Sequence, residues 1–360
     1  MTLTKPVVDG SSAAGPDQAQ PRWLPLRLVL ILAVCGALTV LLATWSLTQG
    51  ATAFSLAEVW GALRADTGDS APFVIREIRL PRIIAAIVGG AALGIAGVIL
   101  QDALRNPIAD PGLLGISQSV ALVGVLLVLF PGVVPDLARP VLFLGAGLVT
   151  GALIAVIARA VRDPVRLILV GFLLAMFFST ITEVITLLGP QDSGDQLASF
   201  FRFQIGSLAG VTWSDLHTVW LWLALAVPGA MLTGRSLNLL QLGDDTATGL
   251  GMNVVRTRLG LLFVAVLLVA PAVSVIGPVE FVALIAPHVC RPLLKTTNAY
   301  LVLPAAGAVG GLTVLAADTI GRLLFFPVEV PAGLWTLIVI GPAAVWLAAD
   351  KLGGSGKGAE

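Results

Sequence analysis

Residues 82–101 read RIIAAIVGGAALGIAGVILQ and contain one charged side chain, that of Arg82. A helix needs about 20 apolar residues to cross about 30 Å of hydrocarbon, so this stretch is long enough to span a membrane. No water is available inside the bilayer to satisfy backbone polar groups, and a helix satisfies them within the segment. The stretch therefore predicts a transmembrane helix.

Further apolar runs lie on both sides of this stretch, and the composition agrees with the pattern. Apolar residues make up 57% of the chain and charged residues 12%, about half the charge of an average soluble domain. The net charge of zero gives no general attraction to nucleic acid. We expect an all-α, polytopic membrane protein with about ten transmembrane helices. The predicted spans are 26–47, 82–101, 113–131, 139–159, 166–189, 212–233, 257–277, 279–294, 300–322 and 331–349.

The chain divides into one membrane domain with a polar tail at each end. Residues 1–23 are rich in Ser, Ala, Pro and Asp and predict a disordered cytoplasmic tail. Residues 24–350 form the membrane domain, and residues 351–360 form the second tail. With the N-terminus inside, Lys and Arg are about twice as frequent on the inner side as on the outer side. This bias predicts that both termini are cytoplasmic.

Charged side chains gather where two spans meet the outer face. Arg79 and Arg82 frame the segment Arg79-Leu80-Pro81-Arg82, so they can share one face of a helix. Two interpretations stay open: interfacial snorkelling, or a docking point for carboxylates of an external protein, which match guanidinium groups. Asp318 precedes Arg322 by one helical turn, a favourable spacing for an ion pair. That pair is either purely local or orients Arg322 for a partner.

Two polar segments on the inner side have more structure than a simple linker. Residues 104–115 read LRNPIADPGLLG and predict a rigid turn. The residues on which this turn is built are Asn106, Pro107, Pro111 and Gly112. Residues 243–251 read GDDTATGLG and predict a short helix, with an Asp as N-cap and a glycine that ends it. Such a helix can lie in a groove of another protein, although an ordinary cytosolic loop is the alternative.

Three ionisable side chains fall within or beside predicted spans. Glu183 lies in the fifth span, where it either lines a water-filled path or lies close to the outer boundary. Glu280 is expected near the outer end of the eighth span. His288 follows the helix-breaking Pro287 and is expected to bond to freed backbone, because a second histidine for a metal site is lacking nearby. We predict no catalytic residue and no metal site.

Two other classes of protein would use such residues differently. An intramembrane enzyme would need acid, base or metal groups that converge, whereas Glu183, Asp318 and His288 fall in different spans at different depths. An ion-coupled secondary transporter often has paired broken helices at mid-membrane, and Pro271 and Pro287 are compatible with such breaks. Transport by the purified protein alone would favour the secondary transporter.

Taken in order along the chain, these segments resemble the FecCD family, the permeases of type II ABC importers, over residues 40–350. Each motif alone is weak, and their occurrence in series is specific. The motifs are Arg79-Leu80-Pro81-Arg82, Arg105-Asn106-Pro107, Ala109-Asp110-Pro111-Gly112-Leu113-Leu114-Gly115, Gly206-Ser207-Leu208, Leu242-Gly243-Asp244-Asp245, Pro287-His288 and Leu315-Ala316-Ala317-Asp318. Many members have glycine where this chain has Glu280 and Ala283, so Glu280 either tunes substrate choice or pairs with an arginine such as Arg322.

The resemblance implies a transport subunit of the cytoplasmic (inner) membrane rather than an enzyme. Its expected partners are a second permease chain, two ATPase subunits and an extracytoplasmic substrate-binding protein. Arg79, Arg82 and Arg322, with Asp318 beside them, are implied to project outward and to grip glutamates on the two lobes of the binding protein. The implied coupling helix, seated on the ATPase, includes Gly243, Asp244, Asp245, Thr246, Ala247, Gly249 and Gly251.

The implied cargo is a ferric siderophore, with cobalamin or haem as alternatives. ATP and magnesium are expected on the ATPase subunits, because this sequence lacks the phosphate-binding loop of ATPases between a strand and a helix. No cofactor is expected on this chain. Glu183 and Glu280 are the side chains expected along the translocation path between the two permease chains.

Overall fold

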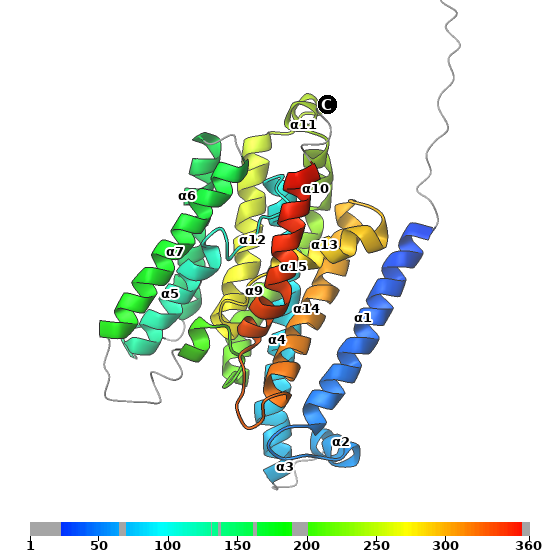
Figure 1. Ribbon diagram of the computed structural model, residues 1–360, viewed down its shortest axis with the longest axis vertical. Coiled ribbons are helices and arrows are strands. Elements are labelled where there is room, and N and C mark those ends of the chain that lie inside the picture. Colours follow the sequence, from blue (N-terminus) through cyan, green and yellow to red (C-terminus); the bar gives the residue numbers. More distant parts are fainter. Residues whose placement is uncertain are drawn as a thin grey trace, which may run out of the picture.

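The computed structural model describes residues 23–64, 70–130, 132–135, 138–160, 164–188 and 201–354. Within these ranges every regular element is a helix, as the apolar runs predict. Figure 1 shows the long helices standing roughly side by side in one bundle.

Ten of the helices correspond one to one with the predicted spans. They are α1 (Trp23–Thr48), α4 (Leu80–Ala103), α5 (Ile116–Leu129), α6 (Arg139–Ala160), α7 (Pro164–Leu188), α9 (Trp213–Leu232), α12 (Val254–Ile276), α13 (Val282–Leu294), α14 (Ala299–Leu323) and α15 (Ala332–Gly354). Short elements join them. These are α2 (Leu56–Arg64), α3 (Ser70–Phe73), the π-helical turn η1 (Val74–Arg79), α10 (Gly234–Gln241) and α11 (Asp244–Gly249).

These helices differ in how much of a membrane they can cross. Among the described residues, 6 helices are long and apolar enough to span, and α9 with α10, bent by 43°, would make a seventh. α5 and α13 are shorter, and each follows a residue in the left-handed conformation: Gly115 with φ 78° and Phe281 with φ 65°. The predicted spans 113–131 and 279–294 are therefore partly replaced by non-helical backbone.

Helix α4 lies at the centre of the bundle, and its glycines let α14 approach closely. A Cβ atom on Gly90 would overlap the carbonyl oxygen of Gly310, and one on Gly310 would overlap that of Gly90. Gly94 faces the carbonyl oxygen of Ala306 in the same way. Inside a membrane, helices associate by close van der Waals packing, which small residues permit. The α4–α14 contact is therefore a glycine interface.

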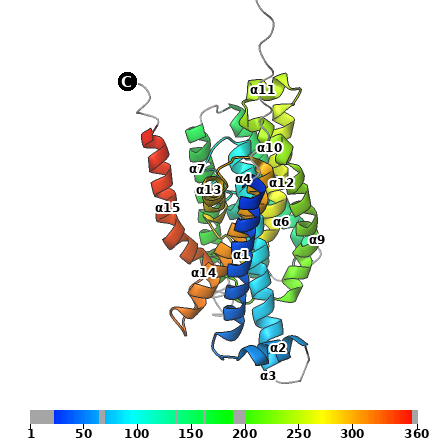
Figure 2. The same ribbon diagram turned by 90° about the vertical axis from the view of Figure 1, so that its right-hand side faces the viewer.

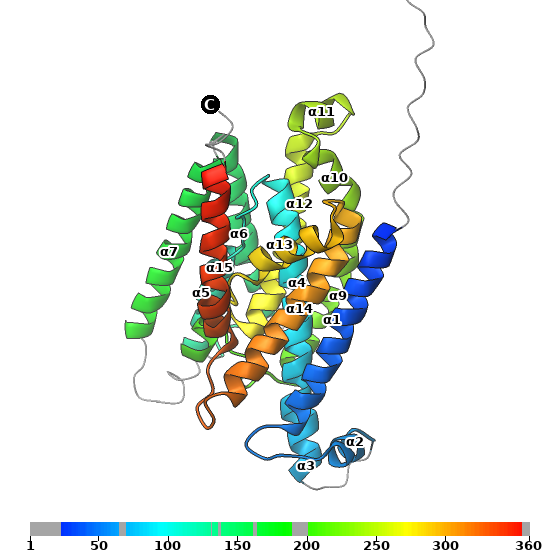
Figure 3. The same ribbon diagram turned by 45° about the vertical axis from the view of Figure 1, so that its right-hand side comes forward.

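The two ends of the bundle carry different elements. α2 and α3 lie together at one end, beside the C-terminal end of α1 (Figure 3); we call this the α2 end. The opposite end, the α11 end, carries α11, the start of α1 and the end of α15 (Figure 2). The first and last described residues therefore lie on the same side as α11.

Two non-helical segments enter the interior and meet there. Residues 104–115 reach the middle of α7: a Cβ atom on Gly171 would lie 3.0 Å from the carbonyl oxygen of Leu113. Residues 277–281 lead into α13, whose first turn packs on α4, since a Cβ atom on Gly97 would overlap the carbonyl oxygen of Ala283. Non-helical backbone at membrane depth is tolerated where protein buries it.

Candidate functional site

Three charged side chains from distant parts of the sequence meet at the α2 end. Arg82 of α4 holds the Asp318 carboxylate of α14 with two atoms, since Nε lies 3.0 Å and Nη2 2.9 Å from its oxygens. The Arg82 Nη1 atom donates to Glu329 at 2.9 Å. Asp318 therefore pairs across the bundle with Arg82, rather than along its own helix with Arg322 as expected.

Arg79 and Arg322 hold the C-terminal end of α1. Arg322 donates from Nη2 to the carbonyl oxygen of Ser46 at 2.6 Å, and Arg79 donates to the carbonyl oxygens of Leu47 and Thr52. The last carbonyl groups of a helix lack partners within it, and a cation there is favourable. Arg79 is 4% and Arg322 7% exposed. The implied outward projection of these two arginines is therefore absent, because backbone carbonyl groups in the last turn of α1 and just after it bind their guanidinium groups.

The predicted short helix is present at the opposite end as α11. Gly243, with φ 114°, occupies the N-cap position, so the expected Asp cap is replaced by a residue that suits this backbone conformation. Gly251 follows the helix with φ 85°. Ala247 is buried and anchors α11, whereas Asp245 and the neighbouring threonines are exposed. The helix thus presents small polar side chains outward.

Asp244 ties α11 to the ends of two longer helices. Arg258 of α12 donates to both of its carboxylate oxygens, at 2.8 and 2.9 Å, and Arg105 Nη1 lies 3.3 Å from Oδ1. Arg258 also donates to the carbonyl oxygen of Ala103 at the end of α4, at 2.9 Å. Arg105 donates to that of Leu240 at the end of α10, at 2.6 Å. A displacement of α11 would therefore act directly on α4 and α10.

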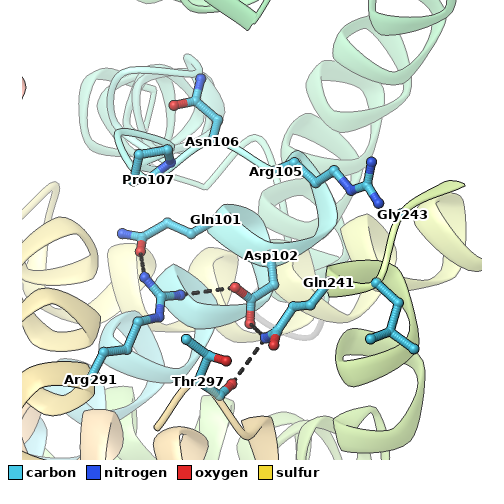
Figure 4. Close-up of a pocket in the computed structure, with 10 residues that line it drawn as sticks. Gln101, Asp102, Arg105, Asn106, Pro107, Gln241, Gly243, Arg291 and Thr297 are labelled. Carbon is cyan, nitrogen blue, oxygen red and sulfur yellow. Dashed lines mark hydrogen bonds and ion pairs between the residues drawn. The ribbon is translucent and has the colours of Figure 1, made fainter. Parts of the chain in front are cut away.

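A groove of about 630 Å³ opens beside α11 (Figure 4). Arg291 of α13 donates to Gln101 Oε1 at 2.7 Å and to Asp102 Oδ1 at 3.0 Å. Gln241 Nε2 donates to Asp102 Oδ2 and to the carbonyl oxygen of Thr297, both at 3.0 Å. The last turn of α4 is thereby joined to α10, to α13 and to the connection that leads into α14.

The predicted rigid turn at 104–115 is present. It does not stay at the inner surface, as predicted, but extends between the helices as far as α7. Asn106 is 4% exposed, and its Oδ1 atom accepts from the Ile108 N–H at 3.0 Å. Asp110 is 2% exposed, and its Oδ1 atom accepts from the Gly112 N–H at 2.8 Å. Pro107 belongs to the wall of the groove in Figure 4. The turn therefore connects the groove to the interior.

Glu280 lies half-buried beside the 104–115 segment, rather than near the outer end of a span. It accepts from the Gln118 amide at 2.7 Å. A Cβ atom on Gly112 would lie 3.5 Å from its Oε1 atom. The expected pairing with Arg322 is not the arrangement found. The first turn of α13 packs on Gly97 in the second half of α4, whereas Arg322 is held by α1 at the α2 end.

Glu183 is not brought together with Glu280. It is exposed on α7, whereas its neighbours Thr182 and Thr186 are buried and donate to carbonyl oxygens one turn earlier. His288 lies with Nδ1 2.8 Å from the Leu284 carbonyl oxygen, a bond to backbone as predicted.

Sequence reasoning missed the side chains that join the helix ends at the groove. Asp102 and Arg291 are 189 positions apart, and Gln241 and Asp102 are 139 apart. The only pattern that pointed to these residues was their position at the ends of spans, where charged residues are common in any case. Local spacing therefore could not identify them.

The comparisons with known proteins agree with this architecture. The model of the FecCD transport family matches residues 38–350. The hemin transport system permease protein HmuU of Yersinia pestis is 36% identical over 338 residues, which cover 92% of this chain and 96% of that protein. The Fe(3+) dicitrate transport system permease protein FecD of Escherichia coli (strain K12) is 34% identical over 290 residues, covering 80% and 89%. The ferric enterobactin permease FepG of the same organism is 34% identical, covering 88% and 93%.

A solved structure gives the same result for the fold. A metal-chelate type ABC transporter in an inward-facing conformation matches with a TM-score of 0.74 and 27% identity, over 88% of this chain and 99% of that chain. The match of the family model extends over nearly the whole described membrane domain. The chain therefore belongs to the FecCD transport family.

Proposed function

We propose that this chain is the permease subunit of an ATP-driven ABC importer that carries ferric siderophores across the cytoplasmic membrane. The observation that carries the proposal is the family match over residues 38–350. It is supported by the short polar helix α11, which is anchored to the ends of longer helices. In this assignment the α11 end is cytoplasmic and the α2 end is extracytoplasmic.

The ATPase partner would contact α11, with residues 243–251 as the coupling segment. Its closing on ATP, with magnesium, would move the whole helix, because Ala247 is buried and Asp244 is held by two arginines. The chain itself contributes no step of ATP hydrolysis. Its part in the cycle is to convert a displacement at α11 into a movement of α4 and the helices packed on it.

The binding protein would dock at the α2 end, where Arg79, Arg82, Arg322 and Asp318 gather. Arg79 and Arg322 would position this face by fixing α1, since their guanidinium groups bind its carbonyl oxygens. Arg82 Nη1 is bound to Glu329, whose side chain is 45% exposed. An incoming carboxylate could replace Glu329 on Arg82 without breaking the buried pair with Asp318.

A second permease chain would pack against the exposed apolar side of α7. Leu173, Met176 and Phe177 are 57%, 52% and 58% exposed there, and Glu183 lies on the same helix. The cargo would pass between the two chains, with Glu183 and Glu280 as candidate side chains along its path. Apolar surface of this extent is stable either against lipid or against another protein.

Transport by reconstituted protein tests the proposal. Proteoliposomes that contain this chain, its ATPase and its binding protein should accumulate a radiolabelled ferric siderophore only when ATP is supplied. Haemin is the necessary second cargo, because the hemin permease HmuU is among the relatives. Uptake of haemin alone would correct the cargo, and uptake without ATPase or binding protein would identify an ion-coupled transporter instead.

A further inference from the structure

Two non-helical segments meet inside the bundle, and each brings one carboxyl group to the place where they meet. Asp110 lies in the segment before α5, and Glu280 lies in the segment before α13. A Cβ atom built on Gly112 would be 3.0 Å from Asp110 Oδ1 and 3.5 Å from Glu280 Oε1. The two carboxyl groups therefore share one small space, which a side chain at position 112 would fill.

The donors that reach these carboxyl groups are neutral. Asp110 Oδ1 accepts from the Gly112 N–H at 2.8 Å. The backbone N–H groups of Leu113 and of Leu284, in the first turn of α13, also face the carboxyl group, and its buried Oδ2 atom has no hydrogen-bond partner of its own. Glu280 Oε1 accepts from the Gln118 amide at 2.7 Å. Asp110 is 2% exposed, so bulk solvent does not reach this oxygen atom. An unpaired, fully buried carboxylate oxygen calls for a bound species.

The arginines on the flanking elements are engaged elsewhere. Arg291 of α13 donates to Gln101 and Asp102. Arg105, which begins the segment that holds Asp110, donates to the Leu240 carbonyl oxygen. Neither side chain therefore neutralises the carboxyl pair.

The other elements around the pair contribute no charge to it among the described residues. α5 faces it with the neutral Gln118. α7 approaches the loop through Leu174 and Ala175, next to Gly115. His288 of α13 lies with its Nδ1 atom against the carbonyl oxygen of its own helix.

Two ionised carboxylates cannot lie side by side in such an interior without large repulsion, and an unpaired charge at membrane depth is costly. We propose that Asp110 and Glu280 form a proton-binding site, in which the pair holds one proton and carries a single negative charge at neutral pH. The bound proton supplies the hydrogen-bond donor that the Asp110 Oδ2 atom lacks. The remaining charge is stabilised by the backbone N–H groups of Gly112 and Leu284 and by the Gln118 amide.

The position of the site connects it to movement. Asp110 precedes α5 and Glu280 precedes α13, so a separation of these helices separates the carboxyl groups and admits water. Each group can then ionise in contact with water, and the proton leaves. Opening of the bundle is in this way linked to proton release, whichever cargo the protein carries.

Infrared spectroscopy of the full-length chain in lipid nanodiscs, over a series of pH values, tests the site. The wild-type protein should show the carbonyl band of a protonated carboxyl group near neutral pH, and the band should disappear as the pH rises. Glu280→Gln and Asp110→Asn should each shift this loss to lower pH, because the remaining acid has no charged neighbour. Glu183→Gln is the matched control, since this carboxyl group is exposed on α7, and it should leave the band unchanged.

Thermal unfolding provides a second measurement should Asp110→Asn not fold. The folded state would hold more protons than the unfolded state, so the Tm of the wild type should fall as the pH rises from about 6 to 8. The fall should be smaller for Glu280→Gln and retained for Glu280→Asp. A wild-type spectrum without the band, or equal slopes for wild type and Glu280→Gln, would overturn the site. The Tm should also be compared in NaCl and in N-methylglucamine chloride. A higher Tm in NaCl for the wild type but not for Glu280→Gln would overturn the site, because a metal ion would then occupy the space.

Discussion

Arg82 and Asp318 are 236 positions apart in the sequence, and their side chains form a two-atom ion pair that fastens α4 to α14. The Asp318 side chain is 2% exposed and that of Arg82 is 11% exposed. A buried pair contributes little beyond a hydrophobic pair of the same shape, but loss of one partner leaves the other charge buried alone. The effect of mutation at this pair should therefore depend on which charges remain.

Replacement of Arg82 by alanine should lower the free energy of unfolding by about 3–5 kcal/mol, because Asp318 would remain buried without a partner. The double change Arg82→Met with Asp318→Leu should recover most of this loss. Glu329→Gln is the control, since the side chain is 45% exposed and should contribute about 1 kcal/mol or less. Denaturant unfolding in detergent measures all three. A loss for Arg82→Ala no larger than for Glu329→Gln would contradict the interpretation.

The glycine interface between α4 and α14 should not accept a methyl group. Gly90→Ala would place a Cβ atom on the Gly310 carbonyl oxygen, and such overpacking costs about 1–3 kcal/mol. Gly145→Ala on α6 is the matched control, because no atom lies within 4 Å of its Cβ position. The Tm of the purified protein should fall for the first variant and not for the second. Equal values of Tm would show that α14 moves away at no cost.

The helices could be predicted because each is a long apolar run that a bilayer forces to be helical. The prediction 82–101 became Leu80–Ala103. The predictions 113–131 and 279–294 failed in part, because the first three residues of each range are loop rather than helix. Leu113 and Leu114 at membrane depth have the composition of a span, and hydropathy does not distinguish a buried loop from a buried helix.

The candidate site could be predicted only where its geometry is local. The short helix in the segment 243–251 could be predicted because its bounding residues lie within a few positions of one another, although the N-cap is Gly243 and not the expected Asp. The partner of Asp318 was expected one turn away at Arg322, and the structure places Arg82 there instead. Glu280 was expected near the outer boundary, and it lies beside the 104–115 segment instead. Such partners depend on which helices pack together, and one sequence does not contain that information in its spacing.

Glu329, the exposed partner of Arg82, should regulate docking of the binding protein. Glu329 occupies Arg82 Nη1 at 2.9 Å and would compete with an incoming carboxylate. Glu329→Gln should strengthen binding by about two- to fivefold, the effect of one exposed ion pair. Surface plasmon resonance with the purified binding protein measures the Kd. Charge reversal at both Arg79 and Arg82 is less informative, because both arginines also stabilise the fold. An unchanged Kd or weaker binding for Glu329→Gln would argue against docking at Arg82.

The start of α2 should be sensitive to acid. The Glu58 carboxylate accepts from the Ser55 N–H at 2.7 Å and from its hydroxyl at 2.8 Å. These bonds, the backbone one first, lower the pKa of Glu58 below its ordinary value. Because this pKa is lowered, the Glu58 carboxylate stabilises the start of α2 near neutral pH. The stabilisation is lost as the pH falls through the pKa of Glu58 in the folded protein. Hydrogen exchange in α2 should therefore accelerate below about pH 4 relative to the intrinsic rate. The same acceleration in Glu58→Gln would exclude this cause.

Asp244 should be needed for coupling rather than for folding. Its ion pairs with Arg258 and Arg105 are partly exposed, with 42% of the Asp244 side chain accessible, so Asp244→Ala should cost about 1 kcal/mol or less in stability. The anchor of α11 would nevertheless be lost, and ATP-driven uptake should fall by about tenfold, equivalent to about 1.4 kcal/mol of coupling. Asp245→Ala is the matched control, because this acid lies next in the same helix and is exposed.

Uptake and ATP hydrolysis must be measured together in the same proteoliposomes. If α11 transmits movement through Asp244, the Asp244→Ala transporter should continue to hydrolyse ATP while uptake fails. The exchange Asp244→Arg with Arg258→Asp should restore part of the uptake, which a double-mutant cycle would detect. If ATP hydrolysis and ATPase binding are lost together with uptake, Asp244 is part of the binding surface itself. If Asp245→Ala is equally defective, the effect belongs to the charge of the helix and not to its anchor.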